Sequence, residues 1–252
     1  DIYQIESWLK IFSELEKSKY FLIVVRSKGA YAWIQKNTDF SVTHCVTIAD
    51  LLSLYDKNNI KCILYVNHAF KNFQSLINGQ ALHIHINHGE SDKTSTITRQ
   101  SQAYDYVFVY GDASIDKYKL NLIRNDERRF VKIGRPQIEF TPEMETINTD
   151  KKIVLYAPTW EGTHDTMDFS SLRLLGLSIV SQLINSDQFY IVYKPHPKVG
   201  VRDPNVMTIH KEIIILLKKY EDALVMLDGD IVSLYEQTDI AIFDNSVVLI
   251  DY

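Results

Sequence analysis

Short apolar runs of strand length recur along this chain, and longer segments with apolar residues at helical spacing separate them. The predicted strands cover residues 20–25, 60–66, 81–86, 105–109, 130–133, 152–156, 189–193, 223–227 and 239–243. The predicted helices cover residues 2–15, 48–57, 68–78, 113–122, 170–184, 206–219 and 230–237. Strands that are apolar throughout, each followed by an amphipathic helix, indicate parallel sheets covered on both faces. The predicted fold class is therefore α/β.

The alternation is interrupted once, between residues 134 and 150. Gly134, Pro136 and Pro142 lie in this stretch, and the polar residues around them follow no period. We therefore predict two Rossmann-like, doubly wound lobes in tandem, at residues 1–137 and 151–252, joined by a linker at 138–150. The first residue is not Met, and the last element, which ends at Tyr252, is short. We expect a piece of a longer protein, with an incomplete second lobe.

Composition excludes several classes of protein. The 27 Lys and Arg residues against 32 Asp and Glu residues give a net charge of −5, which argues against a nucleic-acid partner. Cys45 and Cys62 are the two cysteines, and their number and spacing suggest neither a disulfide framework nor a zinc site. The longest apolar runs, such as residues 213–217, are far shorter than the roughly 18 residues of a membrane-spanning helix. A reducing, cytoplasmic setting is expected.

Polar residues that directly follow a strand are the candidates for chemistry, because ligands of open α/β sheets bind beyond the carboxyl ends of the strands. The first such segment is Asn87-His88-Gly89-Glu90-Ser91-Asp92-Lys93, which follows the strand at 81–86. A neutral His88 there could take a proton from an attacking hydroxyl, since an imidazole titrates near neutral pH. The same pattern also fits a turn histidine bonded to nearby backbone, and the residues alone leave both interpretations open.

The same segment also matches part of a metal-binding pattern. His83, His85 and His88 are similar to the His-x-His-x-Asp-His string of metallo-β-lactamase-type hydrolases, with Asn87 in place of the aspartate. A metal-dependent hydrolase is therefore kept as a minor alternative. In a strand, however, His83 and His85 share one face and can simply pack in the interior. We predict that this chain holds no metal site.

The second segment is Lys194-Pro195-His196-Pro197-Lys198, which follows the strand at 189–193. Its two prolines fix the local dihedral angles and keep His196 out of helix and strand at the edge of the sheet. The two lysines add positive charge that could favour a phosphate. A rigid surface turn would have the same sequence.

The third segment follows the last strand, where Asp244, Asn245, Ser246 and Val247 lead into an apolar helical run. Asn245 or Ser246 is expected to cap this helix, and the amide groups of a helix start can bind a diphosphate. The loop after the strand at 152–156 contains Pro158, Thr159 and Trp160. Its proline and aromatic ring suggest a shaped loop, although Trp160 could equally be ordinary packing.

Taken in order, these segments resemble the CDP-glycerol glycerophosphotransferase family of teichoic-acid and capsule polymer synthases. The resemblance extends over nearly the whole chain. It rests on His88-Gly89, Gly134-Arg135-Pro136, the run from Lys152 to Trp160, Lys194-Pro195-His196-Pro197, and the segment from Asp239 to Tyr252.

The resemblance implies a GT-B architecture, in which two Rossmann-like lobes face each other across a cleft. It implies His88 as the general base of an acceptor lobe and His196 as a stabiliser of diphosphate charge in a donor lobe. The implied acceptor-side residues are Gly89, Glu90, Ser91, Asp92 and Lys93. The implied donor-binding residues are Pro158, Thr159, Trp160, Lys194, Asp244, Asn245, Ser246 and Val247. Val247 stands where the family has a second serine.

By the same resemblance, we expect transfer of glycerol phosphate from CDP-glycerol to a hydroxyl of a polymer or lipid-linked acceptor, with release of CMP. No tightly bound cofactor is expected, and the sequence does not decide a requirement for a divalent metal. The expected location is the cytoplasmic face of a bacterial plasma membrane, with peripheral membrane contact. Two alternatives stay open: a GT-B transferase that uses CDP-ribitol or a sugar nucleotide, and a non-catalytic nucleotide-binding module.

Overall fold

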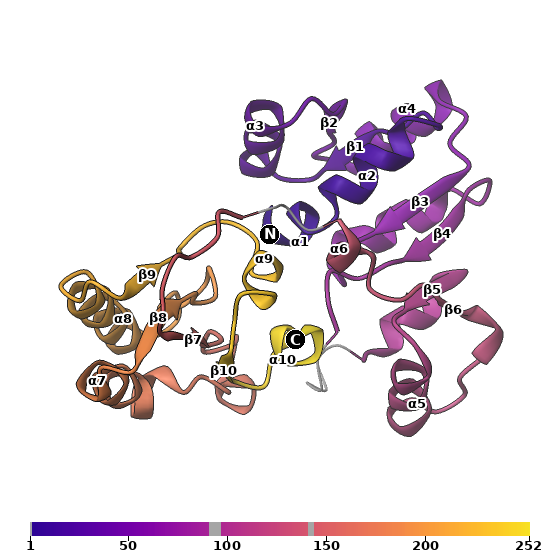
Figure 1. The fold of residues 1–252 in the computed structure, drawn as a ribbon. Coiled ribbons are helices and arrows are strands. Elements are labelled where there is room, and N and C mark those ends of the chain that lie inside the picture. The colour runs from indigo at the N-terminus through magenta and orange to yellow at the C-terminus, as the bar shows by residue number, and fades with distance from the viewer. Residues whose placement is uncertain (1, 91–96, 141–143) are drawn as a thin grey trace. The chain divides into compact units, whose positions relative to one another are not determined.

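The computed structural model describes residues 2–90, 97–140 and 144–252, which divide into two compact units after residue 140. Both units consist of parallel strands and surrounding helices, as Figure 1 shows. The first unit contains strands β1 (Ile23–Val25), β2 (Val42–His44), β3 (Cys62–Tyr65), β4 (Leu82–His85), β5 (Tyr106–Val109) and β6 (Phe130–Lys132). Its α-helices are α1 (Ile2–Glu6), α2 (Leu9–Glu16), α3 (Lys28–Asn37), α4 (Ile48–Lys57), α5 (Asp112–Asn121) and α6 (Pro136–Glu139). Its 3₁₀ helices are η1 (Phe70–Ile77), η3 (Arg99–Ala103) and η4 (Glu127–Arg129).

In the first unit, β3, β4, β5 and β6 form a parallel sheet in that order, and β1 pairs with β2 in a second parallel ladder. Trp8 and Phe12 pack against Ile84 and Ile86 of the sheet, and Ile34 packs against β1. The ends of β3 and β4 are in register, with Tyr65 opposite His85. This register brings the loops that follow these two strands to the same carboxyl edge.

Three features of the first unit differ from the sequence expectation. Residues 26–47, for which no element was predicted, contain α3 and β2. Their apolar signal is weak, because α3 buries only Ile34 and β2 is half-buried along its length. The helix predicted at 68–78 is the 3₁₀ helix η1.

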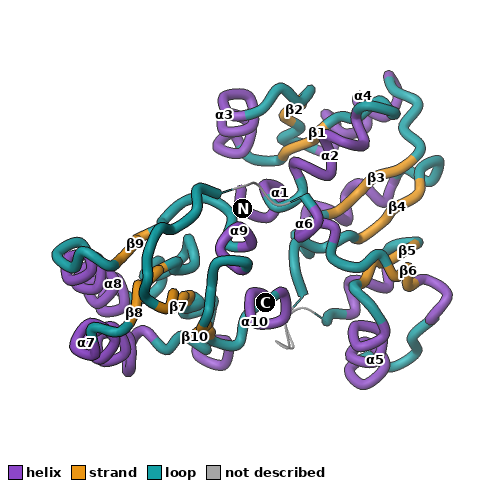
Figure 2. The backbone as a smooth tube through the Cα atoms, in the orientation of Figure 1, coloured by secondary structure: helices purple, strands orange, loops and turns teal. Residues whose placement is uncertain are grey.

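The predicted opening helix at 2–15 is two helices, α1 and α2, as Figure 2 shows. The break falls at Ser7 and Trp8. Trp8 is buried, and its indole N–H donates to the carbonyl oxygen of Asn87. The break thus ties the start of the chain to the loop after β4.

The second unit contains strands β7 (Lys152–Ala157), β8 (Phe189–Tyr193), β9 (Ala223–Val225) and β10 (Ile240–Phe243). Its helices are the 3₁₀ helix η5 (Asp165–Met167), the π-helix η6 (Leu172–Gly176), α7 (Leu177–Ser186), α8 (Pro204–Leu217), α9 (Val232–Tyr235) and α10 (Val247–Asp251). The four strands are parallel and lie in the order β10-β7-β8-β9. The order therefore reverses between β7 and β10. Such a reversal is the usual ligand-binding point of an open α/β sheet.

Both faces of this sheet are buried, as the sequence predicted. Tyr156 and Tyr193 pack with η6, α7 and α8 on one face, and Leu155 and Val192 pack with α9 on the other. The helix predicted at 170–184 begins as the π-helix η6. At its end, a Cβ on Gly176 would lie 3.2 Å from Cδ1 of Ile213 in α8, so a glycine permits the close approach of the two helices.

None of the helices in the described ranges is long and apolar enough to cross a lipid bilayer.

Candidate functional site

His88 lies in the loop after β4, and two contacts define the state of its ring. Nδ1 is 3.2 Å from the carbonyl oxygen of Val66, and Nε2 is 3.5 Å from the side-chain nitrogen of Gln4. A carbonyl oxygen can only accept a hydrogen bond, so in the neutral ring Nδ1 carries the proton. Nε2 then holds a lone pair, which is the state that a general base requires.

The backbone before His88 is shaped for this placement. Asn87 has a φ of 53°, in the left-handed region that asparagine tolerates better than most residues. Its side-chain oxygen accepts a hydrogen bond of 2.9 Å from the backbone N–H of His88. The predicted turn is therefore present, and it presents the ring of His88 at the carboxyl edge of the sheet.

Burial keeps His88 neutral. Loss of solvent is the main cause that lowers the pKa of His88 to about 4, and positive charge on Arg135 and His68 lowers it further. The hydrogen bond to Val66 acts in the opposite direction. At neutral pH the ring is therefore a proton acceptor rather than an imidazolium.

Two further histidines lie beside this ring. The ring centroids of His68 and His85 are 4.0 Å apart, and His85 also stacks on Tyr104 at 5.3 Å. His85 is fully buried, and in the described part of the chain the backbone of Tyr65 is the one hydrogen-bonding group that acts on its ring. Burial lowers the pKa of His85 well below its usual value, and the nearby His68 and His88 add to the effect. This cluster favours neutral imidazoles.

The contacts of His83 favour the packing interpretation over a metal ligand. Its Nδ1 lies 2.7 Å from the hydroxyl of Tyr65 and its Nε2 lies 2.9 Å from the carbonyl oxygen of Asn78, so neither nitrogen is left to bind a cation. Within residues 2–90, 97–140 and 144–252, no three His, Cys, Asp or Glu side chains are grouped so that they could hold a metal ion. The described residues give the metal-hydrolase alternative no support.

Glu90, expected on the acceptor side, bonds within its own unit. Its carboxylate accepts hydrogen bonds from the hydroxyl of Ser114 and from the backbone N–H of Tyr110, the latter at 3.3 Å. The Tyr110 hydroxyl in turn accepts from the Glu90 N–H at 3.1 Å. Burial raises the pKa of Glu90, and these hydrogen bonds oppose the rise. Glu90 and the adjoining Gly89 are buried, whereas Ser91, Asp92 and Lys93 fall outside the described residues.

In the second unit, Asp244 joins the two strand ends at the reversal of strand order. One of its carboxylate oxygens accepts from the backbone N–H of Thr159 at 2.8 Å, and the carboxylate also accepts from the N–H of Ser171 at 3.2 Å. The hydroxyl of Ser171 lies 2.8 Å from that of Tyr156. Asp244 thus braces the carboxyl edge of the sheet, and its predicted contact with the donor stays a prediction.

His196 holds the tautomer opposite to that of His88. The backbone N–H of Lys198 donates to its Nδ1 at 3.0 Å, so the neutral ring carries its proton on Nε2. Its own backbone N–H donates to the carbonyl oxygen of Pro158 at 3.0 Å, which fixes the loop after β8 to the loop after β7. The ring stacks on Trp160 with centroids 6.0 Å apart, and Nζ of Lys198 lies 5.0 Å from the centre of the Trp160 ring. Burial lowers the pKa of Lys198.

Glu161 is a residue that the sequence analysis missed. It is fully buried, and its two carboxylate oxygens accept from the backbone N–H groups of Gly200 at 2.9 Å and Asp203 at 3.0 Å. Its carbonyl oxygen accepts from Arg202 at 2.8 Å. Glu161 therefore holds the chain that follows the Pro-His-Pro segment. The only sequence signal was a glutamate directly after Trp160, which is too common to single out.

Gly200 shows why this loop needs a special backbone. Its φ of 75° is left-handed, and a Cβ there would lie 2.6 Å from Cβ of Met207. A side chain at this position would displace the loop that Glu161 holds.

The remaining predicted donor residues lie at the same edge of the second sheet. Lys194 directly follows β8 and is buried, with its backbone N–H bonded to the Tyr156 carbonyl at 3.0 Å. Asn245, Ser246 and Val247 directly follow Asp244. Ser246 occupies the N-cap position of α10, but its side chain makes no capping hydrogen bond.

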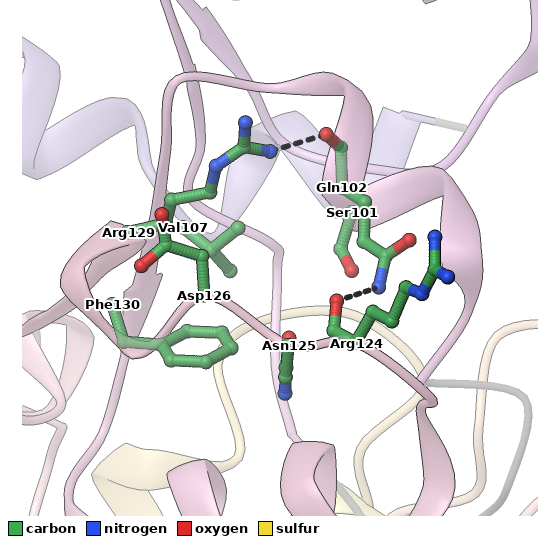
Figure 3. Close-up of a pocket in the computed structure, with 8 residues that line it drawn as sticks. All are labelled: Ser101, Gln102, Val107, Arg124, Asn125, Asp126, Arg129 and Phe130. Carbon is green, nitrogen blue, oxygen red and sulfur yellow. Dashed lines mark hydrogen bonds between the residues drawn. The ribbon is translucent and has the colours of Figure 1, made fainter.

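A cavity of about 270 Å³ lies elsewhere in the first unit, at the amino ends of β5 and β6. Figure 3 shows its lining residues: Ser101, Gln102, Val107, Arg124, Asn125, Asp126, Arg129 and Phe130. Many of its polar groups bond to one another or to nearby backbone. Arg129 donates to the Gln102 carbonyl, and the Gln102 side chain donates to the Arg124 carbonyl at 3.1 Å. The cavity is at the opposite edge of the sheet from His88.

Comparison with known proteins adds a family and a fold. The sequence model of a family described as CDP-Glycerol:Poly(glycerophosphate) glycerophosphotransferase matches residues 13–252. No curated protein matches the sequence.

Solved structures similar to this chain include the following three. A histidine variant of the wall teichoic acid polymerase TagF, soaked with CDPG, superposes with a TM-score of 0.62 at 16% identity, over 96% of this chain and 63% of that one. Unsubstituted TagF superposes with a TM-score of 0.59 at 16% identity, over 98% of this chain and 64% of that one. A glycosyltransferase from Rickettsia africae superposes with a TM-score of 0.54 at 16% identity, over 95% of this chain and 67% of that one. The chain thus spans about two thirds of the length of these proteins, and two parallel α/β units in tandem make its fold class that of GT-B enzymes.

Proposed function

Since this chain belongs to the CDP-glycerol:poly(glycerophosphate) glycerophosphotransferase family of enzymes, we propose that it transfers glycerol phosphate from CDP-glycerol to a hydroxyl of a growing teichoic-acid-like or capsular polymer. The observation that carries this proposal is the state of His88. Its Nδ1 faces the Val66 carbonyl, its Nε2 holds the lone pair, and burial keeps the ring neutral. These are the properties of a base that can accept a proton from an alcohol.

The reaction is an in-line displacement at phosphorus. The acceptor oxygen attacks the phosphorus next to glycerol, and the bond between that phosphorus and the oxygen bridging the two phosphates breaks. The hydroxyl proton moves to Nε2 of His88, and CMP leaves with the bridging oxygen. The product is a new phosphodiester between the acceptor and glycerol phosphate.

His196 is proposed to stabilise the diphosphate. The Lys198 N–H holds Nδ1 as an acceptor, so Nε2 presents an N–H that can donate to a phosphate oxygen. A donor fixed before the reaction stabilises the charge that develops on the leaving phosphate without reorganisation. The stack on Trp160 and the hydrogen bond to Pro158 hold the ring in place.

The other donor-side residues are proposed to complete this site. Lys194 supplies positive charge, and Asn245, Ser246 and Val247 offer backbone amides at the start of α10. Pro158, Thr159 and Trp160 shape the loop, and Asp244 holds it by accepting from Thr159. On the acceptor side, Gly89 and Glu90 are proposed to set the path of the loop that carries His88. The mechanism requires that the donor held at His196 reaches His88 in the other unit.

The test is release of CMP by the intact protein from a panel of activated donors: CDP-glycerol, CDP-ribitol and sugar nucleotides. We expect turnover with CDP-glycerol, and loss of about 10²- to 10⁴-fold in kcat for His88→Ala and His196→Ala. The exposed His164→Ala is the matched control and should retain full activity. Turnover of another donor alone would contradict the assigned substrate. Binding of donor without turnover, unchanged in both variants, would favour a non-catalytic module.

We also propose that the intact protein works against the cytoplasmic face of the membrane, because the acceptors implied by the family resemblance are lipid-linked. Exposed Lys211, Lys218 and Lys219 on and beside α8 would favour an anionic surface. Co-sedimentation with phosphatidylglycerol vesicles, but not with phosphatidylcholine vesicles, is the expected result. Absence of sedimentation with both kinds of vesicle would contradict the proposal.

A further inference from the structure

A chain of side-chain amides leads to the base through α1 and the loop after β3. The Asn72 amide donates to the side-chain oxygen of Asn67 at 3.2 Å and to its carbonyl oxygen at 2.6 Å. The Asn67 amide donates in turn to Oε1 of Gln4 at 3.0 Å. The nitrogen of Gln4 then lies 3.5 Å from Nε2 of His88.

This chain has a direction. Because Oε1 of Gln4 accepts from Asn67, the NH₂ group of Gln4 is the end that faces His88. An NH₂ group can only donate, so its partner Nε2 must accept. The carbonyl of Val66 requires the same tautomer from the opposite side of the ring. Two independent contacts therefore agree on where the proton of His88 lies.

We propose that Gln4 is a positioning residue for the base: it holds the lone pair of His88 Nε2 in place and occupies the position that the acceptor hydroxyl takes during the reaction. This inference rests on the proposed function. The Gln4 N–H and the acceptor O–H are both donors to one lone pair, so binding of the acceptor displaces Gln4. At 3.5 Å the resting contact is long and weak, which makes the exchange easy.

The surroundings of the ring fit this role. The Tyr3 ring of α1 meets His88 edge-on at 5.6 Å, and His68 and Arg135 bear on it electrostatically from the loop after β3 and from the segment before α6. Gln4 lies before residue 13, where the family match begins, so the match does not assign this residue.

The discriminating variant is Gln4→Glu. A carboxylate in place of the amide stabilises the imidazolium, so the acidic limb of kcat/KM should move up by at least one pH unit. From a starting pKa of about 4, kcat/KM at pH 5 should then fall to about half of the parent value or less, and it should recover by pH 7. Gln4→Leu should lower kcat/KM a few-fold without moving the limb. The matched control is Gln35→Glu, at an exposed position on α3. It should change neither kcat/KM nor the position of its acidic limb.

Titration of the histidine ¹⁵N signals of the intact protein separates this inference from the proposed function. His88 is assigned from its absence in His88→Asn. In the parent protein the shifts of His88 should show a protonated Nδ1 and a bare Nε2, and in Gln4→Glu its midpoint should rise. An unchanged midpoint, or the opposite tautomer, would overturn the role of Gln4. A raised midpoint with an unchanged pH profile of activity would uphold the contact and instead remove His88 from catalysis.

Discussion

At the scale of single residues, the candidate site contains two histidines with opposite tautomers. The Val66 carbonyl draws the proton of His88 to Nδ1, whereas the Lys198 N–H leaves the proton of His196 on Nε2. One ring is thereby prepared to accept a proton and the other to donate a hydrogen bond. In each case a backbone group selects the tautomer, so residue type alone does not determine it.

The half-buried His88 predicts a pH dependence of stability. Its pKa is about 4 in the folded chain and 6.5 when exposed, so the unfolded state binds the proton first as the pH falls. The stability of the first unit is therefore unaffected above pH 6.5 and decreases between pH 6.5 and 4. By pH 5 this one group accounts for about 2 kcal/mol.

Urea unfolding at pH 7.5 and pH 5 measures this effect. The His88→Gln variant lacks the titrating group. Between pH 7.5 and pH 5, its free energy of unfolding should therefore fall by about 2 kcal/mol less than that of the parent. His85 remains buried in both proteins, so the comparison isolates the contribution of His88 together with its coupling to His85. An equal loss in the parent and the variant would show that His88 is not held neutral by burial.

Part of the residue-scale picture was accessible from sequence. The segments that carry His88 and His196 stood out because each directly follows a strand and combines turn-forming residues with an imidazole. The partners of these segments did not stand out. Glu161 contacts Gly200 and Asp203, about forty positions away, and a link of that length leaves no local pattern.

At the scale of elements, the second sheet explains how its loops come together. β7 lies between β10 and β8, so the loops after all three strands share one edge. The sequence predicted these strands because each is an apolar run of strand length. It did not predict α3 and β2, which bury few residues, nor the break at Trp8, which depends on a hydrogen bond to Asn87.

The brace formed by Glu161 can be tested on its own. Glu161→Ala leaves the N–H groups of Gly200 and Asp203 without their acceptor and should destabilise the second unit by about 2–3 kcal/mol. Because the loop also carries His196, affinity for the donor should fall at least about tenfold at a temperature where the variant is folded.

Urea unfolding and calorimetric titration of CDP-glycerol are the two measurements. Glu212→Ala, an exposed glutamate on α8, is the control and should change neither. Glu161→Gln keeps one carbonyl oxygen as acceptor, so its stability and donor affinity should lie between those of the parent and those of Glu161→Ala. Full stability and affinity in Glu161→Ala would mean that the loop is held by other contacts.

At the scale of the whole molecule, each unit contributes one histidine loop at the carboxyl edge of a parallel sheet. The alternation of strands and helices predicted this class of fold, and the order of the motifs predicted the family that residues 13–252 match. Periodicity does not record which loops share a ligand. That both histidines act on one donor belongs to the proposed function.

The most direct test is a crystal structure of the intact protein with CDP-glycerol and an acceptor analogue. We predict that Nε2 of His196 donates to a diphosphate oxygen of the bound donor, while Nε2 of His88 accepts from the acceptor hydroxyl that faces the phosphorus next to glycerol. A structure in which the bound diphosphate contacts His196 while His88 lies out of reach of any acceptor would contradict it.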